Sequence, residues 1–173
     1  MKTVYYTATS LDGFLATLDD SVAFLDDVPQ PSEDTYTPFI ANVGAIAMGR
    51  ATYEFLLRHM EGDGKWPYPD HPVWVFTHHD FPERDGVTFT SDPILNVHEG
   101  MVKAAGGKDV WICGGGDLAG QFLDAGLLDE LVITVASRTL RDGKPLLPRD
   151  AKLTLTSARR LGDGFAELRY APA

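Results

Sequence analysis

The sequence contains a single cysteine, Cys113, and no long apolar run. One cysteine cannot form an internal disulfide bond, which excludes a secreted scaffold held together by disulfides. No stretch approaches the roughly 20 apolar residues needed to span a bilayer, and the opening residues MKTVYYTATS lack the apolar run of a signal peptide. We therefore expect a cytoplasmic protein that has no membrane partner.

Basic residues are also scarce. Fifteen Lys and Arg stand against 25 Asp and Glu, which gives a net charge of −10 and a pI near 4.8. Such a chain repels phosphate backbones, so we expect no nucleic-acid partner. The 173 residues, 44% of them hydrophobic, match the size of one globular domain, which we expect to span residues 1–173.

Short runs of apolar and β-branched residues alternate with segments of helical periodicity. The predicted strands are Lys2–Thr9, Ala45–Met48, Val73–Thr77, Val87–Thr90, Val110–Cys113 and Leu131–Ala136, with a closing antiparallel hairpin of Lys152–Arg160 and Phe165–Tyr170. The predicted helices are Glu33–Asn42, Ala51–Arg58, a segment carrying Ile94, Val97 and Met101 that Asp92 caps, and a segment carrying Leu118, Phe122 and Ala125 that Gly126 ends. The alternation predicts an α/β fold with a mixed, mostly parallel sheet.

In such a sheet, ligands bind beyond the carboxyl ends of the strands. Gly114, Gly115 and Gly116 lie at such an end, between a strand and a helix, where backbone N–H groups and the helix N-terminus favour an anion such as a pyrophosphate. The run is neither the dinucleotide pattern G-x-G-x-x-G nor a P-loop. A tight turn without a ligand is the alternative.

Three further segments follow strands. Met48–Glu54 (MGRATYE) offers Arg50 and Thr52 to a phosphate, although a surface role is the commoner fate of an arginine. Thr77, His78 and His79 could flank a nucleotide or be solvated loop residues. The histidines show no metal-ligand spacing, so we expect no metal site. Ser10–Ala16 (SLDGFLA) contains an ordinary Asp-Gly turn.

The segment Glu61–Pro72, rich in Gly and Pro, is predicted to be a surface loop whose Trp66 and Tyr68 either expose apolar surface or fold over the core. Cys113 lies within an apolar strand, which indicates a buried, inert thiol.

The motifs SLDGFLA, MGRATYE, VFTHH, VWICGGGDLAGQFL and DELVITV, in this order, resemble the dihydrofolate-reductase-like superfamily. The similarity is greatest to the reductase domain of riboflavin biosynthesis, the RibD C-terminal domain, and to its stand-alone relatives. The resemblance spans about residues 2–170. It implies a three-layer fold with helices on both faces of the sheet, an NADPH cofactor, a small-molecule substrate and a homodimer.

The resemblance also assigns residues. Those expected at the cofactor are Gly49, Arg50, Thr52, Thr77, His78, Gly114, Gly115, Gly116, Asp117 and Leu118. Those expected near the substrate are Ser10, Asp12 and Gly13, in a mobile loop, and Thr134, at the pocket floor. Dihydrofolate reductases carry an acidic residue on the helix before the M-G-R strand; here Glu33, Asp34 or Thr35 could occupy that position.

These features predict an NADPH-dependent reductase that transfers hydride to a pyrimidine-like, pterin-like or ribosyl-amine substrate, like 5-amino-6-(5-phosphoribosylamino)uracil reductase. Asp12, Glu33 or Asp34 could donate the proton, directly or through water. The sequence leaves three alternatives open: dihydrofolate reduction, a non-catalytic nucleotide-binding protein, and an enzyme that uses NADH.

Overall fold

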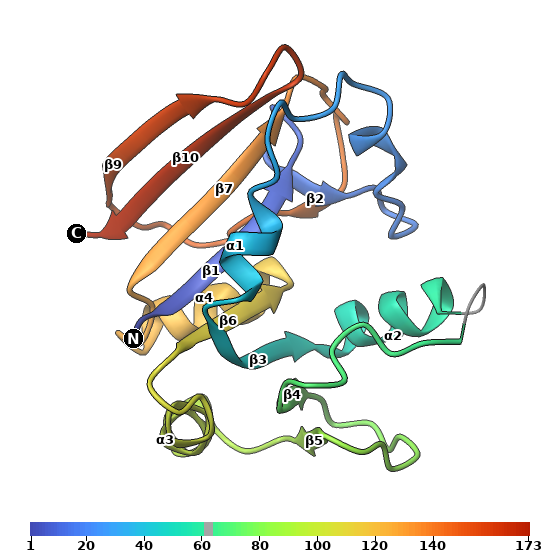
Figure 1. Cartoon of the computed structure of the whole chain (residues 1–173), viewed down its shortest axis with the longest axis vertical. Coiled ribbons are helices and arrows are strands. Elements are labelled where there is room, and N and C mark those ends of the chain that lie inside the picture. Colours follow the sequence, from blue (N-terminus) through green and yellow to red (C-terminus); the bar gives the residue numbers. More distant parts are fainter. Residues whose placement is uncertain (61–63) are drawn as a thin grey trace.

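The computed structural model describes residues 1–60 and 64–173 (Figure 1). An eight-stranded sheet with the order β5-β4-β3-β6-β1-β7-β10-β9 organises these residues. Its strands are β1 (Thr3–Thr9), β3 (Val43–Gly49), β4 (Val73–Phe76), β5 (Val87–Thr90), β6 (Asp109–Gly114), β7 (Glu130–Ala136), β9 (Leu153–Arg160) and β10 (Phe165–Pro172). The first six strands of this order, from β5 through β7, pair in parallel with their neighbours, whereas β10 pairs antiparallel with both β7 and β9. The α/β fold, the mostly parallel sheet and the closing hairpin are thus confirmed.

Helices lie on both faces of the sheet. They are α1 (Tyr36–Ile40), α2 (Arg50–His59), α3 (Ile94–Ala104) and α4 (Gly116–Asp124). Side chains of α3 and α4 pack with Tyr5, Ala45 and Ile112 in one core. Side chains of α1 and α2 pack with Ile46 and Met48 in a second core. Because successive strand residues point to opposite faces, Ala45 and Ile46 belong to different cores, and the three-layer arrangement follows.

A small second sheet was not predicted. It pairs β2 (Phe14–Ala16) with β8 (Lys144–Pro145), and a 3-10 helix, η1 (Ala23–Leu25), follows β2. Strands of three and two residues are too short to show an alternating pattern, so the sequence gives no signal for them. Strand β2 of this sheet lies beside the end of β1 (Figure 1). Residues of both strands line the cavity described below.

Two local predictions were wrong. Helix α1 covers five residues rather than Glu33–Asn42, because residues 31–35 form bends and irregular backbone. Asp92 does not cap α3: Pro93 occupies the N-cap without a side-chain bond, and the Asp92 N–H donates to Thr90 Oγ1 at 3.1 Å.

The Pro-rich segment lies partly outside the described residues, since 61–63 are not described. Within the rest of it, Tyr68 is buried and Trp66 packs against the second core, so these rings fold over the core. No helix within residues 1–60 and 64–173 has the length and apolar character that crossing a membrane requires.

Candidate functional site

A cavity of about 500 Å³ lies at the carboxyl ends of β1 and β6. The β2–β8 sheet and helix α2 form its other walls. Its lining residues are Tyr6, Thr7, Leu15, Ala16, Asp20, Val22, Ala51, Thr52, Phe55, Leu56, Tyr68, Trp111, Cys113, Gly114, Gly115, Gly116, Asp117, Lys144, Pro145 and Pro148. The position agrees with the rule that open parallel sheets bind ligands beyond their carboxyl ends.

The glycine turn forms one wall of this cavity. Gly114 has φ +141°, a value that side chains disfavour, and a Cβ there would lie 3.4 Å from Thr52 Oγ1. A Cβ on Gly115 would meet no atom within 4 Å. Gly115 is the N-cap of α4 and makes no side-chain capping bond, so the N–H groups of the first helical turn lack a partner from the cap. The backbone here is open to a ligand that accepts hydrogen bonds.

The second glycine turn meets the first. Gly49 is the N-cap of α2, and a Cβ on it would lie 3.8 Å from Gly114 O and Gly115 N. Thr52, in the first turn of α2, lines the cavity beside Gly114. The N-termini of α2 and α4 therefore converge on the same end of the cavity, and both helix dipoles favour an anion there.

Other predicted cofactor residues lie farther out. Arg50 is about half exposed, pairs with Glu54 at 3.4 Å and does not line the cavity. Thr77 follows β4; its N–H donates to Thr90 O at 2.8 Å and its hydroxyl accepts from the His79 N–H at 2.9 Å. His78 is exposed. The structure thus places these three residues outside the cavity wall, two of them directly after β4, the strand beside β3.

The side chains of Asp117 and Leu118 already have partners within the protein. The Asp117 carboxylate accepts from Arg149 at 3.1 Å and from Gln121 at 2.8 Å, and the hydrogen bond from Gln121 followed by those from Arg149 lowers its pKa. Leu118 is buried in the α3–α4 core. The polar groups that these positions can offer to a ligand are therefore their N–H groups.

The Ser10–Gly13 turn is clamped to the rest of the fold. Ser10 Oγ donates to Asp12 Oδ1 at 2.7 Å, and Asp12 also accepts from the N–H groups of Leu140 and Arg141 at 2.8–3.1 Å. The bond from Ser10, followed by those backbone bonds, lowers the pKa of Asp12 to about 2. Gly13 takes φ +85°, and its carbonyl accepts from Leu146 N–H at 2.9 Å. These residues hold β2 in place, and the cavity wall itself is formed by Leu15 and Ala16.

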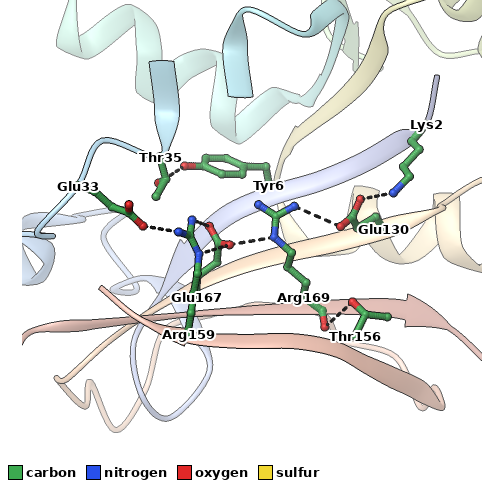
Figure 2. A network of polar contacts seen from close by, with 9 residues as sticks. All are labelled: Lys2, Tyr6, Glu33, Thr35, Glu130, Thr156, Arg159, Glu167 and Arg169. Atoms are coloured by element: carbon green, nitrogen blue, oxygen red, sulfur yellow. Dashed lines mark hydrogen bonds and ion pairs between the residues drawn. The ribbon is translucent and has the colours of Figure 1, made fainter. Parts of the chain in front are cut away.

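The remaining acidic candidates also have partners outside the cavity. Asp34 accepts from the N–H groups of Tyr36 and Thr37 at 2.9 and 3.0 Å, and its bonds to Thr37 lower its pKa. Glu33 pairs with Arg159 (Figure 2). Thr35, the third candidate for the position, hydrogen-bonds through its hydroxyl to the Tyr6 hydroxyl at 2.9 Å, and Tyr6 does line the cavity.

An ionic network on the sheet was missed by the sequence analysis. Glu167, on β10, is 1% exposed and accepts from Arg159 Nε at 3.0 Å and from Arg169 Nε at 2.9 Å. Burial opposes its ionisation, but the two arginines outweigh burial and lower its pKa. Figure 2 shows the chain of pairs running from Glu33 through Arg159, Glu167 and Arg169 to Glu130 and Lys2. Thr134 on β7 pairs with Glu167 on β10, so the two side chains lie on the same face of the sheet. Thr134 is buried and does not line the cavity.

An aromatic wall was also missed. Tyr6, Tyr68 and Trp111 line the cavity; the Tyr68 and Trp111 ring centroids are 5.5 Å apart, and Tyr6 stacks on Phe39 at 4.1 Å. Trp111 Nε1 donates to Tyr6 O at 3.0 Å. Burial raises the pKa of Cys113 to about 12 and also raises that of Tyr68. The thiol and the phenol are therefore uncharged at neutral pH.

Comparison with known proteins places this geometry in context. The family model described as the RibD C-terminal domain matches residues 2–166. The uncharacterized protein YwjB of Bacillus subtilis is 33% identical over 99% of this chain and 98% of its own length.

Two solved structures extend the comparison. A protein from Shewanella sp. PV-4 provisionally assigned to riboflavin biosynthesis is 28% identical, with a TM-score of 0.81 over 100% of this chain and 99% of that one. Dihydrofolate reductase from Enterococcus faecalis, solved with NADP(H), has a TM-score of 0.61 at 17% identity, over 99% and 96% of the two chains. This second likeness shows that the fold is that of dihydrofolate reductase.

Proposed function

Because this chain belongs to the RibD C-terminal domain family, we propose that it is an NADPH-dependent reductase. Its acceptor is a pyrimidine-like, pterin-like or ribosyl-amine compound. The observation that carries the proposal is the meeting of Gly49 and Thr52 with Gly114 and Gly115 at one end of the cavity. Two helix N-termini and an open backbone suit the pyrophosphate of a dinucleotide.

The residues present fit such a cofactor. Gly115 has space for a ligand where a side chain would project, and Thr52 supplies a hydroxyl donor. Gly49, Gly116, Asp117 and Leu118 would add backbone contacts. Arg50, Thr77 and His78 would serve the phosphate farther from the reacting end. When bound, the cofactor supplies the hydride, and the chain positions the acceptor and excludes water.

We propose that the proton reaches the acceptor through water. Asp12, Glu33 and Asp34 lie outside the cavity wall, and the lowered pKa values of Asp12 and Asp34 make both poor acids at neutral pH. Ser10, Asp12 and Gly13 act by holding the β2 wall, and Thr134 supports the sheet beneath it.

Replacement of Arg50 tests the cofactor assignment. We expect Arg50→Ala to weaken NADPH binding about 10-fold, as the loss of one charge-assisted contact implies, with a smaller effect on NADH. Fluorescence titration measures both affinities. Arg160→Ala is the matched control, because Arg160 is exposed at the β9–β10 hairpin, pairs with Asp163 and does not line the cavity. NADPH affinity equal to wild type in Arg50→Ala would remove Arg50 from the site.

A second candidate function is nucleotide binding without catalysis. It is favoured by the absence of Asp12, Glu33 and Asp34 from the cavity wall. NADPH oxidation assayed with aminopyrimidine, dihydrofolate and small carbonyl acceptors separates the two functions: cofactor binding without turnover of any acceptor supports the binding protein.

We further propose that residues 1–173 form one domain, and that the chain works in the cytoplasm as a homodimer, as the family resemblance implies. Strand β9 is one of the two edge strands of the sheet, and Leu155 on it is 55% exposed. Light scattering of wild type and Leu155→Arg tests the dimer: loss of a dimeric mass in the variant locates the interface at this edge.

A further inference from the structure

The charge of the cavity wall restricts the acceptor. Among the lining residues that the structure describes, Lys144 is the single cation, and two residues, Asp20 and Asp117, carry carboxylates. Lys144 Nζ lies 3.7 Å from Asp20, and Asp117 is held by Arg149. The three charged lining side chains therefore sum to a formal charge of −1, and the one cation among them is already paired with Asp20.

The Asp20 carboxylate lies between strand β8 and helix α2. Besides Lys144 on β8, it lies 3.6 Å from Arg58 of α2, which is outside the lining. Both cations are about half exposed. A phosphate or carboxylate that entered here would have to displace Asp20, or lie beside it as a like charge, and either event costs binding free energy.

The rest of the wall suits a flat, uncharged ring. Tyr6, Tyr68 and Trp111 present aromatic surface, and Phe55 and Leu56 of α2 add apolar surface. Aromatic faces and edges bind planar rings through stacking and T-shaped contacts. The uncharged Tyr68 phenol and Cys113 thiol offer hydrogen bonds without charge.

Building on the proposed function, we infer that the acceptor is a flat, uncharged pyrimidine or pterin ring without an anionic tail. The backbone cradle at Gly114–Gly116, which could hold an acceptor phosphate, is the one assigned to the cofactor. The charged lining residues that remain to contact a phosphoribosyl or glutamate tail are Asp20 and Lys144, which is paired with Asp20. The chain thus discriminates against the phosphoribosylated substrate that the family resemblance suggests.

Two ligand pairs test the inference by equilibrium binding to the protein saturated with NADP⁺. One pair is 5,6-diaminouracil and 5-amino-6-(5-phosphoribosylamino)uracil; the other is 6-methyl-7,8-dihydropterin and 7,8-dihydrofolate. Calorimetry should show at least one tail-free ring binding 10-fold or more tightly than its tailed partner. Equal or tighter binding of the tailed ligands, or binding of neither ring, overturns the inference. Failure of NADP⁺ and NADPH to bind at all instead overturns the proposed function.

Asp20→Asn gives a second readout. Asp20 has φ +64°, which asparagine adopts readily, so the variant should fold. It removes one lining charge and releases Lys144 and Arg58, and we expect the preference for the tail-free ring to fall at least threefold. Asp26→Asn, an equal charge change at an exposed residue outside the wall, should leave the preference unchanged. An unchanged preference in Asp20→Asn overturns the role assigned to this wall.

Discussion

Replacing Glu167 by glutamine tests whether the ionic network stabilises the sheet. The carboxylate is 1% exposed and accepts three hydrogen bonds, from Arg159 Nε and Nη2 at 3.0 and 3.2 Å and from Arg169 Nε at 2.9 Å. Glutamine preserves the shape but removes the charge and turns an N–H₂ donor toward a guanidinium. The variant can therefore keep only those hydrogen bonds that its one remaining amide oxygen accepts.

The expected loss follows from how much each partner is exposed. Breaking a fully buried ion pair costs about 3–5 kcal/mol. Here the Arg159 and Arg169 side chains remain 42% and 40% exposed, so water can solvate them once Glu167 is neutral. We expect the free energy of unfolding to fall by about 2–3 kcal/mol, which corresponds to a decrease of roughly 4–12 °C in Tm for a chain of this size.

Denaturant unfolding at several pH values measures this effect and its sign. The folded-state pKa of Glu167 lies below its ordinary value of 4.5. Its stabilisation is therefore fully present above about pH 4.5 and is lost as the pH falls through the folded-state pKa. The difference between wild type and Glu167→Gln should be constant from pH 6 to 8 and should shrink below pH 4.5.

Glu33→Gln is the matched control. Glu33 pairs with the same Arg159, but its side chain is 51% exposed, so we expect a loss below about 1 kcal/mol. If Glu167→Gln proved as mild as Glu33→Gln at pH 7, burial of the carboxylate would not govern the strength of this network, and the reasoning would be refuted.

Three further predictions concern the cavity walls. Gly116→Ala should lower the free energy of chemical unfolding by about 1–3 kcal/mol, because its Cβ would lie 2.3 Å from Pro145 O. Gly115→Ala, whose Cβ meets open space, should keep its stability and lose affinity for NADPH. Equal stabilities of the two variants would contradict this. Asp12, with a pKa of about 2, stabilises the fold above its ordinary pKa of 3.8 and ceases to do so as the pH falls through about 2. Asp12→Asn should lower activity because it weakens the contacts that hold β2, and it should not move the pH profile of activity between pH 5 and 9. A shift in either limb of that profile would instead indicate that Asp12 donates the proton. Cys113, with a pKa raised to about 12, should react with iodoacetamide at pH 8 roughly 100-fold or more slowly in the native protein than after unfolding, as mass spectrometry can follow.

Much of the fold could be predicted because apolar periodicity marks strands and helices that carry a core. Val73–Phe76 and Val110–Cys113 are buried strands whose composition indicates strand directly. Asp92 shows the limit: a cap residue before proline is a local signal, yet its N–H binds Thr90 Oγ1 and the helix begins later. Local chemistry permits more than one arrangement, and here the contact that forms is a second local one, to a residue two positions earlier.

The part of the candidate site that the sequence indicates is its turns. Gly114 was singled out from its place after a strand and Gly49 from the family resemblance, and the parallel sheet brings the two together. Tyr6 and Trp111 were not identified as site residues, since a ring within a strand has the same sequence pattern whether it faces a core or a cavity. The pattern FAELRY shows that Glu167 and Arg169 share a face, but the burial of that face depends on segments more than 100 residues away, near Glu33.

The place of β1 in the sheet has a consequence for synthesis. Tyr5 of β1 is fully buried and pairs with Ile112 on one side and Leu131 on the other. Both partners emerge from the ribosome long after it: at ~5–20 residues per second, Leu131 follows Tyr5 by about 6–25 s. The first strand to be made has neither of its neighbours until Ile112 is synthesised, and it has only one of them until Leu131 follows. The nascent chain must therefore keep an apolar, aromatic strand from associating elsewhere until more than two thirds of the protein has been translated.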